Sequence, residues 1–277
     1  MSTLADRDVL CIQSTRFGEG RTAPAVEVTD LVLAGAAAFV AGGVNAVAGG
    51  GTLVSFPTLV GLGVSSKMAN ITNTVALCPG YFGGAMAQRG ALASRRSHLR
   101  KVLPVSALGG LVGSVLLVVT DDKLFDSIVP FLILIACALL GFQDSIKRVV
   151  FSHRLAPTDG VTPLSLLAGV FIASVYGGYF GAGLGIMLLA VLGLVLDGEL
   201  PSLNALKSVL ALAINVLAAL FFVFSGKVEW AFAAVMAPTS LAGGHVGGLI
   251  AGRMKPKVMR AVVITFGVLV ALRMLLW

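Results

Sequence analysis

The chain alternates long apolar blocks with short polar or charged segments. The blocks cover residues 31–48, 52–64, 70–88, 102–119, 128–143, 163–180, 184–196, 203–224, 230–251 and 259–276. Most of them approach the roughly 20 residues that a helix needs to cross a bilayer, whereas 52–64 and 184–196 are too short to span comfortably. The pattern predicts an all-α polytopic membrane protein in which these two short blocks form half-helices or re-entrant segments.

Composition excludes an ordinary soluble domain. Of the 277 residues, 57% are hydrophobic and 12% are charged, and the mean hydropathy is +0.97. A transmembrane barrel would instead show alternating segments of about 10 residues. Residues 1–30 carry scattered charges and lack the apolar core of a signal peptide, so we expect a loosely held polar N-terminal tail there.

The net charge of +7 reflects membrane topology and does not indicate a nucleic-acid partner. Basic residues gather in the loops at 95–101, 147–154 and 253–260, next to apolar blocks, which favours a cytoplasmic location for these loops. The acidic segment 120–126 should face outward. Followed through the blocks, this pattern predicts that both termini lie outside.

The two halves of the chain match in order, which indicates a duplication. We therefore divide the membrane region into repeats 31–154 and 155–277, forming one integrated transport domain. Block 102–119 runs from inside to outside and its mate 230–251 runs the other way, so the repeats are inverted. Each repeat is expected to hold a Gly-broken or re-entrant helix pair followed by three transmembrane helices. Two pairs, Gly49 with Gly181 and Gly51 with Gly183, are separated by the same number of residues. The other pairs share a second separation that is slightly longer: Asn70 with Asn204, Asn73 with Lys207, Thr74 with Ser208, Pro104 with Pro238, Gly109 with Gly243, Gly110 with Gly244 and Gly113 with Gly247.

A glycine-rich break interrupts the apolar run at matching places in the two halves, at 49–52 and 181–185. Irregular backbone at membrane depth is costly unless it lines an enclosed cavity, and paired breaks point to a transporter site. The N-terminus of a half-helix offers N–H groups and a positive dipole end to an anion. The alternative is that these glycines only allow helices to cross closely. The candidate substrate-binding residues are Asn45, Gly49, Gly50, Gly51, Thr52, Asn70, Asn73, Thr74, Gly181, Gly183, Asn204, Lys207 and Ser208.

Each polar candidate also has a structural alternative. The asparagines could form buried hydrogen bonds between helices. Lys207 could act as a counter-charge for an anion, or its side chain could snorkel to the membrane interface. His245 is a candidate for proton coupling, although a lone histidine among glycines is more often a packing residue.

No motif supports an enzyme. The sequence contains no GxSxG, HExxH or Walker A pattern and no pair of intramembrane aspartates. The three cysteines, Cys11, Cys78 and Cys137, are far apart and have no metal-ligand spacing. We therefore predict no catalytic residue, no cofactor and no metal.

Several segments together resemble one family of transporters. They read AGGGTLVSFPTL, ANITNTVAL, PGYFGGAMAQRG, GGYFGAGLGIMLLAVL, NALKSVLALAINVLAALFFVFSG and GGHVGGLIAGRM, and they run from about Leu31 to the C-terminus. This series resembles the TauE/SafE family of sulfite and sulfonate exporters, also called the toluene-sulfonate-uptake permease family. The resemblance implies a multi-pass transporter of the bacterial inner membrane for sulfite, sulfoacetate or organosulfonates. The site residues that it carries over are Gly49, Gly50, Gly51, Pro57, Asn70, Asn73, Gly181, Gly183, Asn204 and Lys207, although the second half has no proline equivalent to Pro57.

These observations favour a secondary transporter that moves a small sulfur-containing anion by alternating access between the repeats. The family resemblance implies that it is an exporter. A proton, another cation or the membrane potential would drive it. Its partners would be the anion and the lipid bilayer, and a homo-oligomer is compatible with the sequence. Two alternatives stay open, namely an anion channel with the same breaks as its filter, and a membrane assembly or scaffold protein without transport.

Overall fold

The computed structural model describes residues 27–47, 49–152, 164–197, 199–250 and 256–276. Most of the predicted N-terminal tail lies outside these ranges. Over the described residues the secondary structure is helical throughout, as predicted. The helices are α1 (Val28–Val47), α2 (Thr52–Gly61), α3 (Ser66–Ala87), the 3₁₀ helix η1 (Arg89–Arg95), α4 (Arg96–Val119), α5 (Asp122–Gly141), α6 (Gln143–Ser152), α7 (Leu164–Tyr179), α8 (Leu184–Val195), α9 (Leu200–Phe224), α10 (Trp230–Ile250) and α11 (Pro256–Leu276).

Five helices, α1, α4, α5, α9 and α10, are long and apolar enough to cross a membrane. Large apolar side chains such as Val119, Leu164 and Phe224 lie exposed on the outside of the bundle, as expected for surfaces that face lipid. The two short apolar blocks form α2 and α8, with 10 and 12 residues. Because an α-helix rises by only about 1.5 Å per residue, neither helix can span a bilayer alone, in agreement with their predicted character as half-helices.

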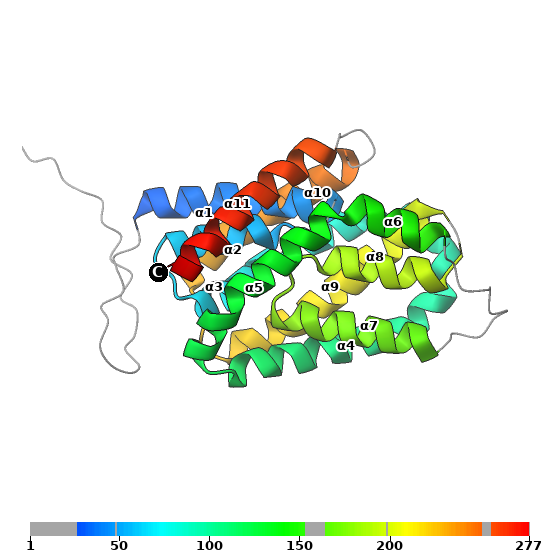
Figure 1. The fold of residues 1–277 in the computed structure, drawn as a ribbon, viewed down its shortest axis with the longest axis horizontal. Helices are drawn as coiled ribbons and strands as arrows, with labels where there is room; N and C mark the ends of the chain where they lie inside the picture. Colours follow the sequence, from blue (N-terminus) through cyan, green and yellow to red (C-terminus); the bar gives the residue numbers. More distant parts are fainter. Residues whose placement is uncertain (1–26, 48, 153–163, 198, 251–255, 277) are drawn as a thin grey trace, which may run out of the picture.

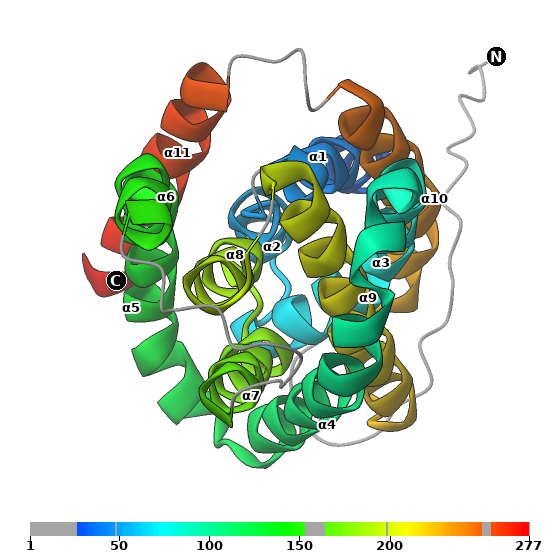
Figure 2. The same ribbon diagram turned by 90° about the vertical axis from the view of Figure 1, so that its right-hand side faces the viewer.

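The long helices run roughly along the long axis of the molecule, and the short apolar helices α2 and α8 lie inside the bundle. In Figure 1 the start of α1 and the turn between α4 and α5 lie at the left end, and α6 lies toward the opposite end. In the end-on view of Figure 2, α2 and α8 lie between α5 and α11 on one side and α1, α3 and α9 on the other. Accordingly, α2 packs against α1, α3 and α11, and α8 packs against α6, α7 and α9. This interior position explains why Leu53, Phe56, Leu188 and Leu192 are all buried.

Contacts between the two halves occur in matching pairs. Helix α1 packs on α10 and α4 packs on α7, as a duplicated structure would require. A Cβ added to any of four glycines on α4 and α10 would crowd the backbone of a facing helix, so the close helix crossings depend on the absence of side chains there. Each contact has a counterpart in the other half at the predicted sequence separations. The contact of Gly109 with Phe171 corresponds to that of Gly243 with Phe39, and the contact of Gly110 with Ile214 corresponds to that of Gly244 with Gly80. These contacts agree with a duplication, while the repeat boundaries and the inverted orientation stay predictions.

The two glycine breaks are built alike. Gly49 donates its N–H to the carbonyl of Val44 at 3.0 Å, and Gly181 donates to Tyr176 at 3.2 Å. The φ angles of the two glycines are 83° and 80°, in a region that side chains disfavour. Each break therefore ends one helix and begins a short one within a few residues, and the two breaks bring α2 and α8 to the centre of the molecule.

Candidate functional site

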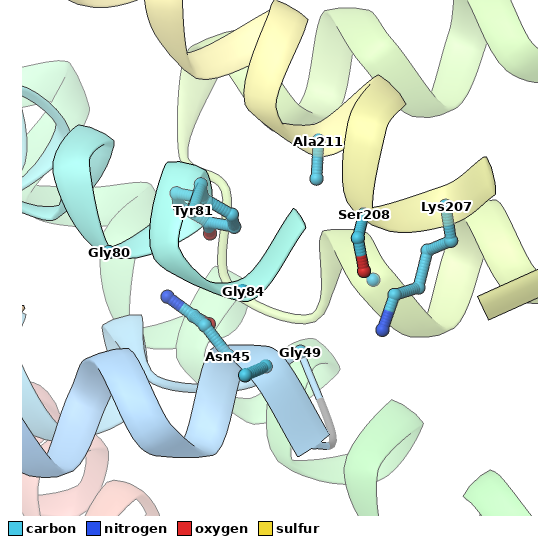
Figure 3. Close-up of a pocket in the computed structure, with 10 residues that line it drawn as sticks. Asn45, Gly49, Gly80, Tyr81, Gly84, Lys207, Ser208 and Ala211 are labelled. Carbon is cyan, nitrogen blue, oxygen red and sulfur yellow. The ribbon is translucent and has the colours of Figure 1, made fainter. Parts of the chain in front are cut away.

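A small pocket lies where the first break meets the second half of the chain (Figure 3). Helices α1 and α3 and the first break contribute one side, and α8 and α9 contribute the other. The pocket is lined by Asn45, Ala46, Gly49, Gly80, Tyr81, Gly84, Gly185, Lys207, Ser208 and Ala211. Four of the residues predicted from the sequence, Asn45, Gly49, Lys207 and Ser208, are thus brought together.

Lys207 supplies the charge of the pocket. The residue is only 3% exposed. Its Nζ atom lies beside Gly185, because a Cβ atom built on Gly185 would be 3.7 Å from it. Figure 3 shows the side chain reaching from α9 toward the first break. Among the described residues no carboxylate forms an ion pair with this amine. A buried ammonium group without a partner is costly, so the position favours an anionic ligand over the snorkelling alternative.

Asn45 presents an amide donor to the same pocket. Its Oδ1 atom accepts a hydrogen bond of 2.7 Å from the Gly51 N–H at the N-terminus of α2. Because a backbone N–H can only donate, this bond fixes the orientation of the amide. The Asn45 Nδ2 atom is buried and makes no hydrogen bond within the described part of the chain.

The N-terminus of α8 adds a backbone donor. Gly185 is the second residue of this helix, where N–H groups have no partner within the helix. The neighbouring N–H groups of Ile186 and Met187 both donate to the Gly183 carbonyl, whereas the Gly185 N–H makes no such bond in the described structure. The N-terminus of α8, with its positive dipole end, therefore lies at the pocket.

The Ser208 hydroxyl of the pocket is already satisfied. It donates to the Asn204 carbonyl at 2.9 Å and accepts a hydrogen bond from Gln88 Nε2 at 3.3 Å. Gln88 Oε1 in turn accepts from Asn204 Nδ2. This network ties the C-terminal end of α3 to α9. The free polar groups of the pocket are thus donors, namely Asn45 Nδ2, Lys207 Nζ and the Gly185 N–H.

The other predicted side chains on α3 lie outside this lining. Because α3 begins at Ser66, Asn70, Asn73 and Thr74 lie within the helix and not at its start. Asn70 Nδ2 donates to the Tyr179 carbonyl at 2.8 Å, beside the second break. Thr74 donates to the Asn70 carbonyl at 3.0 Å, and Asn73 is buried.

Most of the predicted break residues shape the backbone and do not line the pocket. Gly50, Gly51 and Thr52 are buried around the start of α2, and a Cβ on Gly51 would collide with the Ala41 carbonyl oxygen. Gly181 and Gly183 form the second break, and both adopt positive φ angles. Pro57 is buried inside α2. His245 is exposed on the outside of α10, so the histidine considered for proton coupling does not reach the pocket.

Sequence reasoning missed several pocket residues because they are small or lie inside helices. Ala46, Gly80, Gly84 and Ala211 leave space and contribute no functional group. Tyr81 is partly buried against the apolar core, and the only signal that marks it is a large side chain within the run Gly80–Gly84. Gln88 and Gly185 could have been found, since one is a polar residue at the end of an apolar block and the other closes the second break.

Relatives of the chain are bacterial proteins named for membrane transport. The chain is 28% identical over 245 residues to the probable membrane transporter protein ORF9 of a Sinorhizobium species, covering 86% of this chain and 90% of the relative. A probable membrane transporter protein of Haemophilus influenzae is 28% identical over 244 residues, with 85% and 91% covered. The probable membrane transporter protein YfcA of Escherichia coli K12 is 23% identical over 244 residues, with 86% and 87% covered. No solved structure matches the chain.

These relatives, with the five apolar helices, identify a multi-pass transporter of the bacterial inner membrane. The model of the family described as sulfite exporter TauE/SafE matches residues 34–274, which is nearly the whole membrane region. The resemblance found in the sequence is thereby confirmed, and the chain belongs to the sulfite exporter TauE/SafE family.

Proposed function

We propose that this protein is a secondary transporter that carries a small sulfur-containing anion, such as sulfite, sulfoacetate or another organosulfonate. One observation carries the proposal: the free polar groups of the central pocket are donors, and one of them is a buried ammonium group. A bound anion would supply the missing partner of Lys207, which lowers the cost of burying its charge. The family suggests the same class of substrate.

The donors suit an oxyanion headgroup in particular. A sulfite ion or a sulfonate group carries three oxygens on one sulfur, and the pocket offers three free donors from three elements. Hydrogen bonds to a charged acceptor are stronger than neutral ones, and the N-terminus of α8 adds a favourable dipole.

We propose that transport proceeds by alternating access. The pocket is lined by residues of both halves, so a movement of one half against the other would open it toward one side of the membrane at a time. The glycine contacts between α1 and α10 and between α4 and α7 show where the two halves meet, so we place the surfaces that move against each other there. The substrate would cross unchanged, without chemical conversion.

Flux into proteoliposomes tests this function. Purified protein is reconstituted, and uptake of labelled sulfite or sulfoacetate is measured against an outward gradient of the same unlabelled anion. Saturable counterflow is expected for the wild-type protein, and a reduction of at least tenfold is expected for Lys207→Met. Lys101→Met is the matched control, because it removes the same charge from an exposed position on α4 and should keep normal flux.

Two outcomes would contradict the proposal. One is the absence of saturable flux of any of these anions in correctly folded wild-type protein. The other is undiminished flux in Lys207→Met, which would mean that the anion passes elsewhere.

A further inference from the structure

A second group of buried polar atoms lies on α3 beside the second break, outside the pocket described above. Asn70 and Asn73 are each only 1% exposed. The Oδ1 atoms of both side chains are buried and make no hydrogen bond within the described residues. Leaving such atoms without a partner is costly, so two of them less than one helical turn apart indicate a missing ligand.

The orientation of Asn70 shows which kind of ligand is missing. Its Nδ2 atom donates to the Tyr179 carbonyl, and a carbonyl oxygen can only accept. The amide therefore cannot be turned around without placing two oxygens against each other. Asn70 Oδ1 must then remain an acceptor, and the missing ligand must be a cation or a hydrogen-bond donor.

The matching position in the other half carries the opposite character. Asn73 corresponds to Lys207 at the spacing that relates the two halves, and the first residues of α3 and α9, Ser66 and Leu200, are separated by the same spacing. Lys207 brings a positive charge to the first break, whereas Asn73 brings an unpaired oxygen to a corresponding place on α3. A free cation at Asn73 would thus occupy the role that the lysine ammonium group fills in the second half.

The end of α7 supplies further oxygens of the right kind. This helix ends at Tyr179, next to Asn70. The carbonyls of Tyr176 and Tyr179 already accept hydrogen bonds from Gly181 and Asn70, whereas those of Gly177 and Gly178 accept none from the residues described after the helix. Freed carbonyls at a helix C-terminus are the ligands that broken-helix transporters use for coupling cations. The negative end of the α7 dipole favours positive charge at the same place.

The neutral character of the ligands favours a monovalent ion. Within the described residues no group of three or more His, Cys, Asp or Glu side chains could hold a metal ion, whereas divalent Ca²⁺ sites rely on carboxylates. The charge nearest along α3, on Lys67, is paired with Asp122 at 3.0 Å and donates to the carbonyls of Val118 and Thr120. This ion pair limits the repulsion between Lys67 and a cation bound further along the helix.

We propose that Asn70 and Asn73, with carbonyl groups at the C-terminal end of α7, bind a sodium ion. The role of this ion as the coupling ion rests on the transport function proposed above, whereas its binding does not. Carried together with the anion, the sodium ion would cancel one unit of the negative charge moved across the membrane. It would also couple transport to the sodium gradient.

Thermal unfolding of the purified protein tests the site without any sulfur anion. The midpoint is measured in NaCl and in choline chloride at equal ionic strength, so that chloride is constant. A ligand of the folded state raises the midpoint, and the rise should grow with Na⁺ concentration until it saturates. Asn73→Leu keeps the side-chain volume and removes the oxygen, so it should abolish the rise. Lys101→Met, at an exposed position on α4, should retain it.

Equal midpoints in NaCl and choline chloride for the wild-type protein would overturn the proposal, since water alone would then satisfy the two oxygens. A full Na⁺ effect in Asn73→Leu would also overturn it. If Asn73→Leu does not fold, Asn73→Asp decides: its carboxylate should shift the effect to lower Na⁺ concentration, and an unchanged concentration dependence contradicts the site. A Na⁺ effect without anion flux would refute the transport function alone.

Discussion

Gly49 in the first break and Gly185 in α8 lie with their backbones in direct contact. A Cβ added to Gly49 would be 2.8 Å from the Gly185 Cα atom, and one added to Gly185 would be 2.9 Å from the Gly49 Cα atom. Real side chains do not approach a backbone this closely. The two glycines thus hold the first break against the second half-helix, and both line the central pocket.

Alanine at either glycine should therefore destabilise the protein and impair anion binding. Gly49→Ala introduces both the overlap and an unfavourable φ of 83°, so we expect a loss of about 1–3 kcal/mol in the free energy of unfolding. Gly185→Ala lacks the φ effect and should cost less. Thermal unfolding of the two variants in detergent shows whether Gly49→Ala loses more stability than Gly185→Ala.

Gly61→Ala is the control for these variants. Gly61 is the last residue of α2, and no atom lies within 4 Å of an added Cβ. This substitution should be neutral or should stabilise the helix by up to about 1 kcal/mol. A loss at Gly61 as large as that at Gly49 would show that the helix, and not the contact between the halves, is sensitive to substitution.

Replacing Lys207 should make the ligand-free protein more stable. The Lys207 ammonium group is buried without an acidic partner in the described structure, and exchanging a buried charge for an apolar side chain of similar volume often stabilises by about 1–4 kcal/mol. Lys207→Met should raise the unfolding midpoint in buffer without substrate. Lys101→Met, at an exposed position, should change stability by less than about 0.5 kcal/mol. A lower midpoint for Lys207→Met would mean that the amine already has a stabilising partner.

Asn45→Asp should separate the two roles of the Asn45 amide. The carboxylate keeps an acceptor for the Gly51 N–H and replaces the free donor by a negatively charged oxygen. It should neutralise Lys207, which lines the same pocket, and repel an anion. The variant is expected to fold at least as stably as the wild-type protein and to lose counterflow of sulfite. Retained counterflow would exclude the Asn45 amide as a substrate contact.

The ion pair between Lys67 and Asp122 should contribute modestly to stability. The Lys67 side chain is buried, but the Asp122 side chain is 74% exposed, so water screens the interaction. Asp122→Asn should lower the free energy of unfolding by about 1 kcal/mol, because Lys67 keeps its two backbone acceptors. Asp126→Asn, an exposed neighbour on α5, should have no measurable effect. Equal effects of the two substitutions would reflect overall charge and not this pair.

The sequence was sufficient for the helical class, the two short helices and the paired breaks, because these features are local. The glycines of the two breaks adopt positive φ angles that end a helix, and a block of 10 to 12 apolar residues cannot span a bilayer. Six of the ten predicted blocks started too late, however, because polar first turns are invisible to an apolar pattern. Helix α9 begins at Leu200, so Lys207 lies about 10 Å along the helix, where its buried side chain lines the pocket.

The sorting of the polar residues into two groups could not be predicted. It depends on partners that only the fold brings close, since the Gly51 N–H occupies the oxygen of Asn45, while the Tyr179 carbonyl occupies the nitrogen of Asn70. One asparagine is left with a free donor and the other with a free acceptor. Sequence alone treats both as equivalent neutral residues, and only the packed structure distinguishes them.

Binding of a sulfur anion to the purified protein tests the central claim most directly. The unfolding midpoint is measured with increasing sulfite or sulfoacetate, against gluconate, at constant sodium concentration and ionic strength. The pocket predicts a saturating rise for the wild-type protein and for Lys101→Met, and none for Lys207→Met or Asn45→Asp. The claim is contradicted if the wild-type protein shows no rise, or if Lys207→Met shows the same rise.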